Sequence, residues 1–266
     1  MMRLTSFHRL LMCILAFVVN QATAAVPPAP KLPADAYLLM DATTGQVLVD
    51  YNGDLSLPPA SLTKIMTSYV LAEEVDAGRA SLDDMIKVSR NAWSQNPTFE
   101  GSSLMWIEPG KPVSLADLER GVVISSGNDA SVAVAEHLAG TESSFVDVMN
   151  QLAVELGLDN TVYRNPHGLP HPEHRTTARD LAALSVALIN GHPEHYKIYK
   201  EQSFTYNGIK QYNRNSLLRS DVTVDGLKTG YTSEAGYGLV ASAQREDMRL
   251  VSAVLGSASK RTRASE

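Results

Sequence analysis

Apolar residues come in short runs at both ends of the chain, a pattern typical of β-strands. Residues 37–40 and 46–51 flank a loop that contains Gly45, which predicts a β-hairpin near the N-terminus. Towards the C-terminus, residues 222–228 predict a strand, and residues 238–243 and 249–255 predict a second hairpin. Both ends of the chain are therefore expected to contribute β structure.

The middle of the chain, residues 81–218, has mostly helical periodicity. Apolar residues recur at steps of three and four within residues 145–156, as on one face of a helix. Ser114, and Thr176 with Thr177, are typical of residues that begin helices. We therefore predict an α/β fold of the α+β type: an antiparallel sheet from both chain ends, flanked by helices, with a mostly helical insertion. A cleft between the sheet edge and the insertion is the expected place for a site.

The first 24 residues are typical of a secretory signal peptide. Arg3 and Arg9 precede an apolar run over residues 10–19, and small residues at 22–24 follow it. The run is short for a bilayer span, although an uncleaved signal anchor is the alternative. We therefore expect an exported protein, located in the periplasm, with one domain over residues 25–266.

The cysteine content and the net charge exclude several classes of function. Cys13 is the only cysteine, and it lies in the predicted signal peptide, so neither disulfides nor thiol chemistry are expected in the mature chain. Removing Arg3 and Arg9 takes two positive charges from a chain of net charge −6 and leaves −8. No basic cluster indicates nucleic acid, and no second apolar stretch indicates a membrane span.

Ser61 and Lys64 form a Ser-x-x-Lys motif where a helix is expected to begin, after Pro58 and Pro59. A spacing of three places both side chains on one helix face, so the amine can activate the hydroxyl as a nucleophile. The helix start would also direct backbone N–H groups at a developing oxyanion. A second match at residues 257–260 shows that the motif alone is weak, and a helix cap beside a solvated lysine is the alternative.

Two further motifs follow in order. Ser126-Gly127-Asn128 lies on a loop between two apolar helices, and Lys228-Thr229-Gly230 lies on a predicted strand. Ser-x-Asn also occurs at residues 89–91 and 94–96, whereas Lys-Thr-Gly occurs once. The order and placement of the three motifs together indicate a serine acyl-transfer site.

The chain resembles the penicillin-binding serine DD-peptidases, and most closely the low-molecular-weight D-alanyl-D-alanine carboxypeptidases of the periplasm. Besides the three motifs, the resemblance covers residues 99–103, 165–169, 211–215 and 224–230. Ser-Gly-Asn, where class A β-lactamases carry Ser-Asp-Asn, favours the carboxypeptidase branch. The resemblance implies removal of the terminal D-alanine from peptidoglycan stem peptides through an acyl-enzyme, and inhibition by β-lactams.

The resemblance also implies roles for individual residues. Ser61 would attack the D-Ala-D-Ala carbonyl, and Lys64 would take its proton. Lys228 would lie close enough to lower the pKa of Lys64 by like-charge repulsion. Ser126 would relay a proton to the leaving amine, and Asn128 would hold the peptide amide.

Substrate binding is expected at the Lys-Thr-Gly strand. The backbone N–H groups of Ser61 and Tyr231 would bind the oxyanion, and the strand through Lys228, Thr229, Gly230 and Tyr231 would pair with the extended peptide. Arg263 falls where the resemblance places an arginine that anchors the substrate carboxylate. Arg214 is a second candidate, with a salt bridge that supports the site as its alternative role.

No metal or cofactor is expected. Two His-Pro-Glu-His segments, residues 171–174 and 192–195, look like a repeated metal motif. Proline inside each segment argues against two ligands on one helix face, so we interpret both as surface loops. His167 is expected to have a structural or supporting role.

Alternatives remain open. A β-lactamase or DD-endopeptidase would share the chemistry, although Glu173 is the only glutamate between Leu158 and Arg175 that could deacylate as in class A β-lactamases. A non-catalytic penicillin-binding or wall-binding module would bind without acylation. Family members of the closest type continue into a helix, a β-rich domain and an amphipathic membrane anchor. The chain is therefore expected to be C-terminally incomplete, with membrane contact only through segments that it lacks.

Overall fold

The computed structural model describes residues 29–265. The fold is that of one compact unit, which begins at Lys31. The predicted signal peptide, residues 1–24, lies outside the described residues. Within the described chain, no helix is both long and apolar enough to cross a bilayer.

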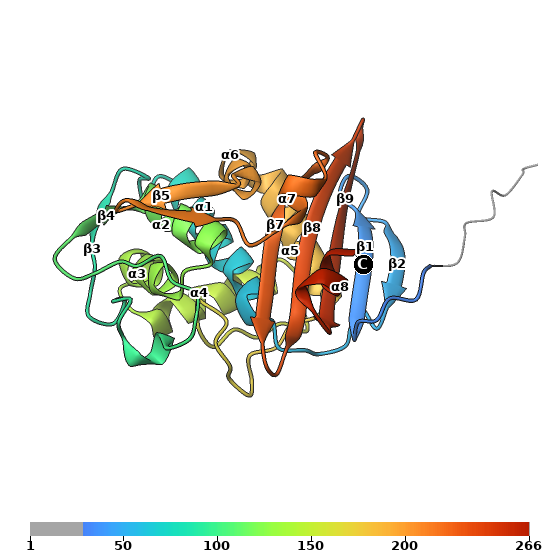
Figure 1. Cartoon of the computed structure of the whole chain (residues 1–266), viewed down its shortest axis with the longest axis horizontal. Helices are drawn as coiled ribbons and strands as arrows, with labels where there is room; N and C mark the ends of the chain where they lie inside the picture. Colours follow the sequence, from blue (N-terminus) through green and yellow to red (C-terminus); the bar gives the residue numbers. More distant parts are fainter. Residues whose placement is uncertain (1–28, 266) are drawn as a thin grey trace, which may run out of the picture. The chain divides into compact units, whose positions relative to one another are not determined.

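The framework is a five-stranded antiparallel sheet in the order β2-β1-β9-β8-β7 (Figure 1). The first strand pairs along its whole length with the last one, so the prediction of one sheet built from both chain ends is confirmed. β7 forms one edge of the sheet and is longer than predicted. The strands are β1 (Ala36–Asp41), β2 (Val47–Tyr51), β7 (Val224–Thr232), β8 (Gly236–Arg245) and β9 (Met248–Ser257).

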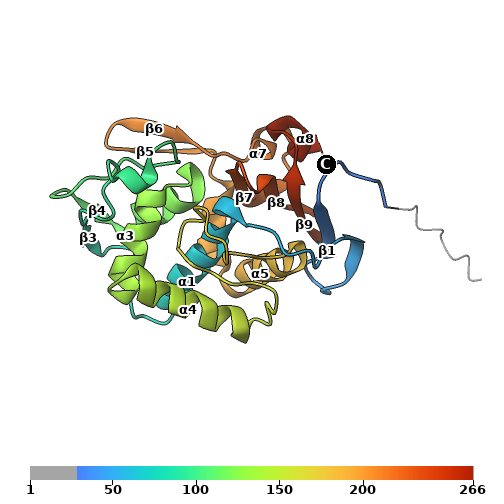
Figure 2. The same ribbon diagram turned by 90° about the horizontal axis from the view of Figure 1, so that it is seen from below.

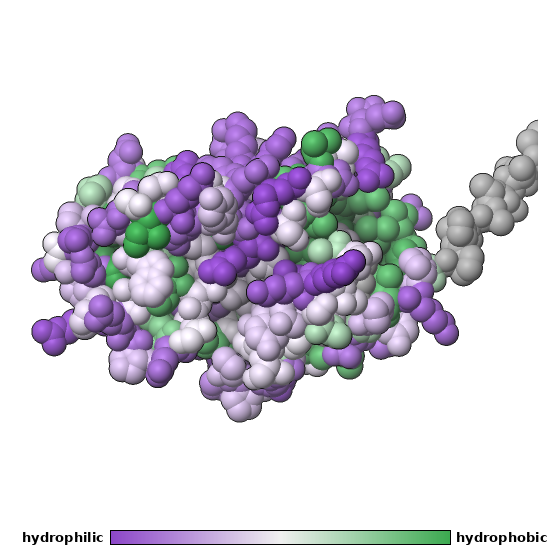
Figure 3. Space-filling model, viewed as in Figure 1, coloured by the Kyte–Doolittle hydropathy of each residue, from purple (hydrophilic) through white to green (hydrophobic). Residues whose placement is uncertain are grey.

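Helices lie on both faces of this sheet (Figure 2). α5 (Ala178–Gly191) packs on β9 and β1, where alternate residues such as Leu38 and Val251 belong to the core. The short helix α8 (Lys260–Ser265) packs on β8 and β9 from the other face. Beside α8, apolar residues including Leu39 and Leu250 line a hollow of about 430 Å³, and hydrophobic surface gathers there (Figure 3).

The insertion between β2 and β7 is mostly helical, as the periodicity predicts, and α1 (Lys64–Asp76) runs through its centre. Every residue of α1 from Lys64 to Ala72 is buried, so this helix has no polar face that reaches water over its first two turns. Around α1 lie the other helical elements: α2 (Leu115–Arg120), the π-helical turn η3 (Gly121–Ser125), α3 (Asn128–Ala139) and α4 (Glu142–Glu155).

Local sequence signals explain where these helices begin. The Ser114 hydroxyl accepts a hydrogen bond from Asp117 N at 3.1 Å, and Thr177 accepts one from Asp180 N at 3.0 Å. Both are side-chain caps of the kind predicted, and they satisfy N–H groups that the first helical turn leaves unpaired.

The insertion also contains short elements that the periodicity does not reveal, because three or four residues are too few to show a period. There are two small two-stranded antiparallel sheets. One pairs β3 (Met85–Lys87) with β4 (Pro112–Ser114), and the other is the hairpin of β5 (Ser203–Tyr206) and β6 (Ile209–Tyr212). The remaining short elements are η1 (Ala60–Thr63), η2 (Pro97–Phe99), α6 (Pro193–Tyr196), η4 (Lys197–Lys200) and α7 (Leu217–Ser220).

The interpretation of the two His-Pro-Glu-His segments as surface loops is wrong for three of the four histidines. Only His171 is exposed; the buried ones are His174, His192 and His195. Histidine tolerates burial where its N–H groups find partners. His192 Nδ1 lies 2.6 Å from Asp76 Oδ2, and His195 Nδ1 lies 2.6 Å from Glu119 Oε1, which fastens the α5–α6 junction to α1 and α2.

Candidate active site

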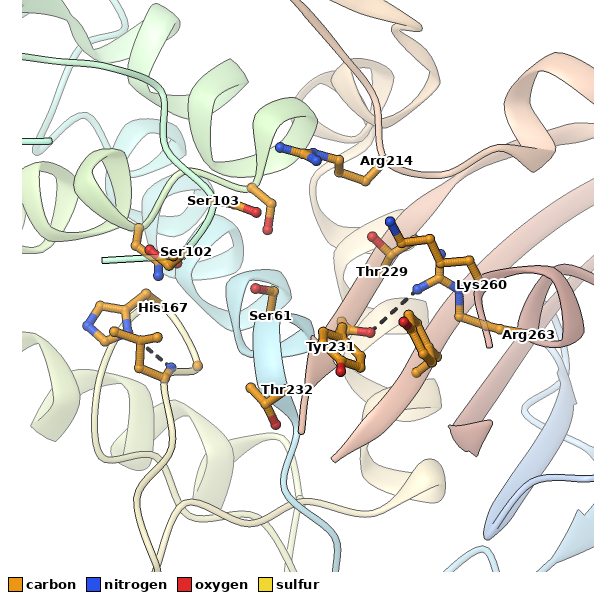
Figure 4. A pocket seen from close by; sticks show the side chains of 17 residues that line it. Ser61, Ser102, Ser103, His167, Arg214, Thr229, Tyr231, Thr232, Lys260 and Arg263 are labelled. Atoms are coloured by element: carbon orange, nitrogen blue, oxygen red, sulfur yellow. Dashed lines mark hydrogen bonds between the residues drawn. The ribbon is translucent and has the colours of Figure 1, made fainter. Parts of the chain in front are cut away.

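A cleft of about 260 Å³ opens between β7 and the helical insertion, where the sequence predicts it (Figure 4). In Figure 4, Ser61 lies between the His167 side and the strand that carries Thr229 and Tyr231, with Arg214 above it. All three motifs contribute to this one cleft. Their lining residues are Ser61, Ser126, Asn128, Thr229 and Gly230.

Ser61 and Lys64 meet at the junction of η1 and α1. Lys64 is fully buried, and its Nζ lies 3.1 Å from Ser61 Oγ. The same nitrogen donates to Asn128 Oδ1 at 2.7 Å and to the backbone oxygen of His167 at 2.6 Å. Both oxygens can only accept, so they take two N–H bonds, and in a neutral amine the remaining lone pair faces the serine hydroxyl. This is the arrangement that a general base requires.

Burial lowers the pKa of Lys64 from its ordinary value of 10.5 to about 7, while the nearby carboxylate of Asp129 works in the opposite direction. The resemblance implies repulsion by Lys228 as the cause, whereas the lowered pKa of Lys64 results from burial. Burial likewise lowers the pKa of Lys228, and the neighbouring charges of Lys64, Arg214 and Arg263 lower it further.

Lys228 comes from the middle of β7 and is also buried. Its Nζ donates to Ser126 Oγ at 2.9 Å and to the backbone oxygen of Thr229 at 3.1 Å. Ser126 follows the π-helical turn η3 and has a left-handed backbone with φ +60°. Because its oxygen accepts from Lys228, its own hydrogen is available to another acceptor in the cleft.

Asn128 is the first residue of α3, and the next residue, Asp129, supports the site although the three sequence motifs do not include it. The carboxylate of Asp129 is fully buried and accepts from four backbone N–H groups: Met105 (2.8 Å), Trp106 (2.8 Å), Ile107 (3.2 Å) and Ala130 (2.9 Å). A side chain at Gly127 would crowd this carboxylate and Met105 N. Asp129 thus ties one wall of the cleft to the start of α3.

The loop at residues 165–169 closes the site from the other side. Its contribution to Lys64 is a backbone oxygen rather than the His167 ring; the Thr67 hydroxyl also donates to Pro166 O at 2.5 Å. Gly168 has φ +87°, and any Cβ on it would overlap the carbonyl oxygen of Ala60. Glycine at this position therefore permits the loop to pack directly against the turn that carries Ser61.

Cationic side chains surround the β7 end of the cleft. Arg263 on α8 is buried, with Nη1 3.2 Å from Gly238 O and 3.4 Å from Gly230 O. Arg214 is exposed and directed into the cleft, because Asn213 and Asn215 on either side are buried and bond to backbone oxygens. Arg214 forms no salt bridge with a carboxylate within residues 29–265, which removes support for that alternative.

Comparisons with known proteins agree with this fold. The family described as D-alanyl-D-alanine carboxypeptidase matches residues 21–259. D-alanyl-D-alanine carboxypeptidase DacC of Escherichia coli is 51% identical over 94% of this chain and 62% of its own length. DacA of the same organism is 46% identical over 91% of this chain and 60% of its own length. The chain thus spans about three fifths of these relatives.

Solved structures give the same result. Penicillin-binding protein 5 of Haemophilus influenzae superimposes with a TM-score of 0.87 at 45% identity, over 89% of this chain and 69% of that one. Penicillin-binding protein D2 of Listeria monocytogenes, solved with ampicillin bound, superimposes with a TM-score of 0.78 at 32% identity. The match covers 89% of this chain and 94% of that one.

A sheet built from both chain ends, with a helical insertion and a Ser-x-x-Lys helix start at their junction, defines the class of penicillin-binding serine peptidases. Within this class, the chain belongs to the D-alanyl-D-alanine carboxypeptidase family.

The role of Asp129 can be tested by stability. Asp129→Ala would leave the N–H groups of Met105, Trp106 and Ile107 without their acceptor, and we expect it to lower the free energy of unfolding by roughly 3 kcal/mol in urea titrations. Asp159→Ala, at an exposed position, should change it by less than about 0.5 kcal/mol. Similar values for both variants would show that the buried carboxylate does not hold this wall.

Proposed function

We propose that this chain is a serine D-Ala-D-Ala carboxypeptidase that removes the terminal D-alanine from peptidoglycan stem peptides through an acyl-enzyme. The observation that carries the proposal is the buried Lys64 amine, which faces Ser61 Oγ at 3.1 Å at the base of a cleft bordered by Arg263. Relatives of the same family, at 46–51% identity, are named D-alanyl-D-alanine carboxypeptidases.

Acylation follows from the positions of the side chains. Ser61 Oγ attacks the carbonyl carbon of the scissile bond while Lys64 Nζ takes its proton. The negative charge that develops on the carbonyl oxygen is stabilised by the backbone N–H groups of Ser61 and Tyr231. The C–N bond then breaks, and Ser126, which accepts from Lys228, passes its proton to the nitrogen of the departing D-alanine. The proton that Lys64 took from Ser61 replaces it on Ser126, which returns Lys64 to the neutral form.

Deacylation repeats these roles with water as the nucleophile. Lys64, again neutral, takes a proton from water as the water attacks the Ser61 ester. The bond to Ser61 Oγ then breaks, and Lys64 returns the proton to this oxygen, which restores the serine hydroxyl. A β-lactam would acylate Ser61 in the same way, since its ring amide replaces the peptide. Inhibition results where the second step is slow.

The cleft also supports binding of a peptide with a free carboxyl end. β7 is an edge strand, so its backbone groups can pair with an extended peptide. Asn128 Oδ1 accepts from Lys64, which leaves Nδ2 to donate to a substrate carbonyl. Thr229 and Arg263 lie together at the β7 end, where a hydroxyl and a guanidinium suit a carboxylate, with Arg214 as a second cation.

We also infer that the protein is exported and acts at the cell wall outside the cytoplasm. The signal-peptide pattern of residues 1–24 and the peptidoglycan substrate of the proposed reaction both support this location.

The function is tested with a D-Ala-D-Ala peptide and with penicillin. We expect the wild type to release D-alanine and to gain the mass of penicillin on Ser61, while Ser61→Ala forms no adduct and loses roughly 10⁶-fold in rate. Penicillin turnover without D-alanine release would indicate a β-lactamase instead. Binding of penicillin without a mass increase would indicate a non-catalytic module.

The pKa of Lys64 predicts the pH dependence of acylation. Since the pKa is lowered to about 7, the amine is protonated below that pH and neutral above it. The second-order rate constant for acylation by penicillin should rise about tenfold per pH unit below pH 7 and level off near pH 8. Lys64→Arg, which stays protonated, should be slow at every pH. A wild-type profile that is flat from pH 5 to 9 would contradict this assignment.

Arg263 is expected to bind the terminal carboxylate of the peptide. Arg263→Ala should raise KM for the peptide by roughly tenfold or more, with a smaller effect on penicillin acylation, because it removes a charge-assisted hydrogen bond. Arg261→Ala, on the exposed side of α8, is the matched control and should change neither value. Equal losses for peptide and penicillin would show that Arg263 does not recognise the carboxylate.

A further inference from the structure

The turn that presents Ser61 has an unusual backbone. Ala60, directly before the nucleophile, has φ +49°, a left-handed conformation that residues with a Cβ rarely adopt. Ala60 is buried, and Pro59 precedes it. Such a conformation persists only where the surrounding structure holds it, so the contacts of this turn determine where Ser61 points.

Two groups fix the Ala60 carbonyl. The hydroxyl of Thr63, which is fully buried, donates to Ala60 O at 2.8 Å. Gly168 packs against the same oxygen so closely that no Cβ would fit. The carbonyl therefore cannot rotate away without breaking the hydrogen bond or displacing the loop.

Thr63 is in turn held by His174, the last residue of the first His-Pro-Glu-His segment. His174 Nε2 lies 3.0 Å from Thr63 Oγ1. The single hydrogen of Thr63 is already donated to Ala60 O, so the proton of this second bond must come from His174 Nε2. His174 is then the tautomer with Nδ1 bare, which agrees with Nδ1 having no hydrogen-bond partner among residues 29–265.

The surroundings of the His174 ring hold it in one position and one charge state. It is buried and lies edge-to-face with the Tyr163 ring, with centroids 5.7 Å apart. Burial lowers the pKa of His174 to about 3, so the ring stays neutral at any pH at which the enzyme would work. Two backbone bonds of 2.9 Å between Thr176 and Leu57 fasten the residues just after His174 to the chain that leads into the turn.

We propose that His174 is a positioning residue for the nucleophile: through Thr63 it holds the strained Ala60 turn, and thereby the Ser61 hydroxyl and N–H, in the geometry required for acylation. This inference rests on the proposed function of Ser61. It also gives the His-Pro-Glu-His segment a role that needs no metal, and it assigns that role to one of its two histidines.

The test compares acylation rates of folded variants. His174→Leu removes the donor, and we expect its second-order rate constant for acylation of Ser61 by penicillin to fall by about tenfold to a hundredfold, the range for misplaced reacting groups. His174→Gln, whose side-chain amide nitrogen can replace Nε2 as donor, should recover most of the rate. His171→Leu changes the exposed histidine of the same segment and should match the wild type.

The partner residue gives an independent measurement if His174→Leu does not fold. Thr63→Val removes the hydroxyl at nearly constant volume and should be slow, whereas Thr63→Ser keeps it and should be close to the wild type. The proposal is supported if Thr63→Val is slow and Thr63→Ser is not. It is likewise supported if His174→Leu is slow and His174→Gln recovers the rate. Equal rates within either pair overturn it. Absence of a penicillin adduct on wild-type Ser61 would instead overturn the proposed function itself.

Discussion

The structure depends on one buried amine. Among residues 29–265, no carboxylate lies within hydrogen-bonding distance of Lys64 Nζ, which forms hydrogen bonds with two carbonyl oxygens and a hydroxyl. Burying an ammonium ion without an anionic partner is costly, so the site favours the neutral base. The surroundings that make this possible are apolar and extensive: α1 is enclosed by α3, α4 and α5, and Lys64 sits at its first turn.

Convergence on this amine explains why the insertion and the sheet must fold together. Asn128 reaches it from α3, His167 O from the loop behind Ser61, and Lys228 approaches from β7 through Ser126. Residues 128, 167 and 228 are far apart in the sequence. The sheet brings the ends of the chain together, and the buried helix α1 contacts both the helices of the insertion and β7.

Local signals made the framework and the motif residues predictable. Runs of apolar residues gave the two hairpins, and Ser114 and Thr177 marked helix starts because capping depends on neighbours in the sequence. Asp129 and His174 could not be recognised, because their partners lie 22 to 24 and 111 residues away. The interpretation of the histidine segments as surface loops is wrong for the same reason, because the burial of His192 and His195 depends on carboxylates on α1 and α2.

The two buried lysines, Lys64 and Lys228, affect each other's protonation. Both pKa values are lowered by burial, and the proximity of the two groups means that they are not easily protonated together. A substrate carboxylate bound beside Thr229 and Arg263 would favour the charged form of Lys228, which directly precedes Thr229 on β7. Protonated Lys228 would then repel a proton from Lys64. In the proposed reaction, binding of an anionic peptide end would thus help keep the base neutral, and substrate recognition would be coupled to the activation of Ser61 through this pair of amines.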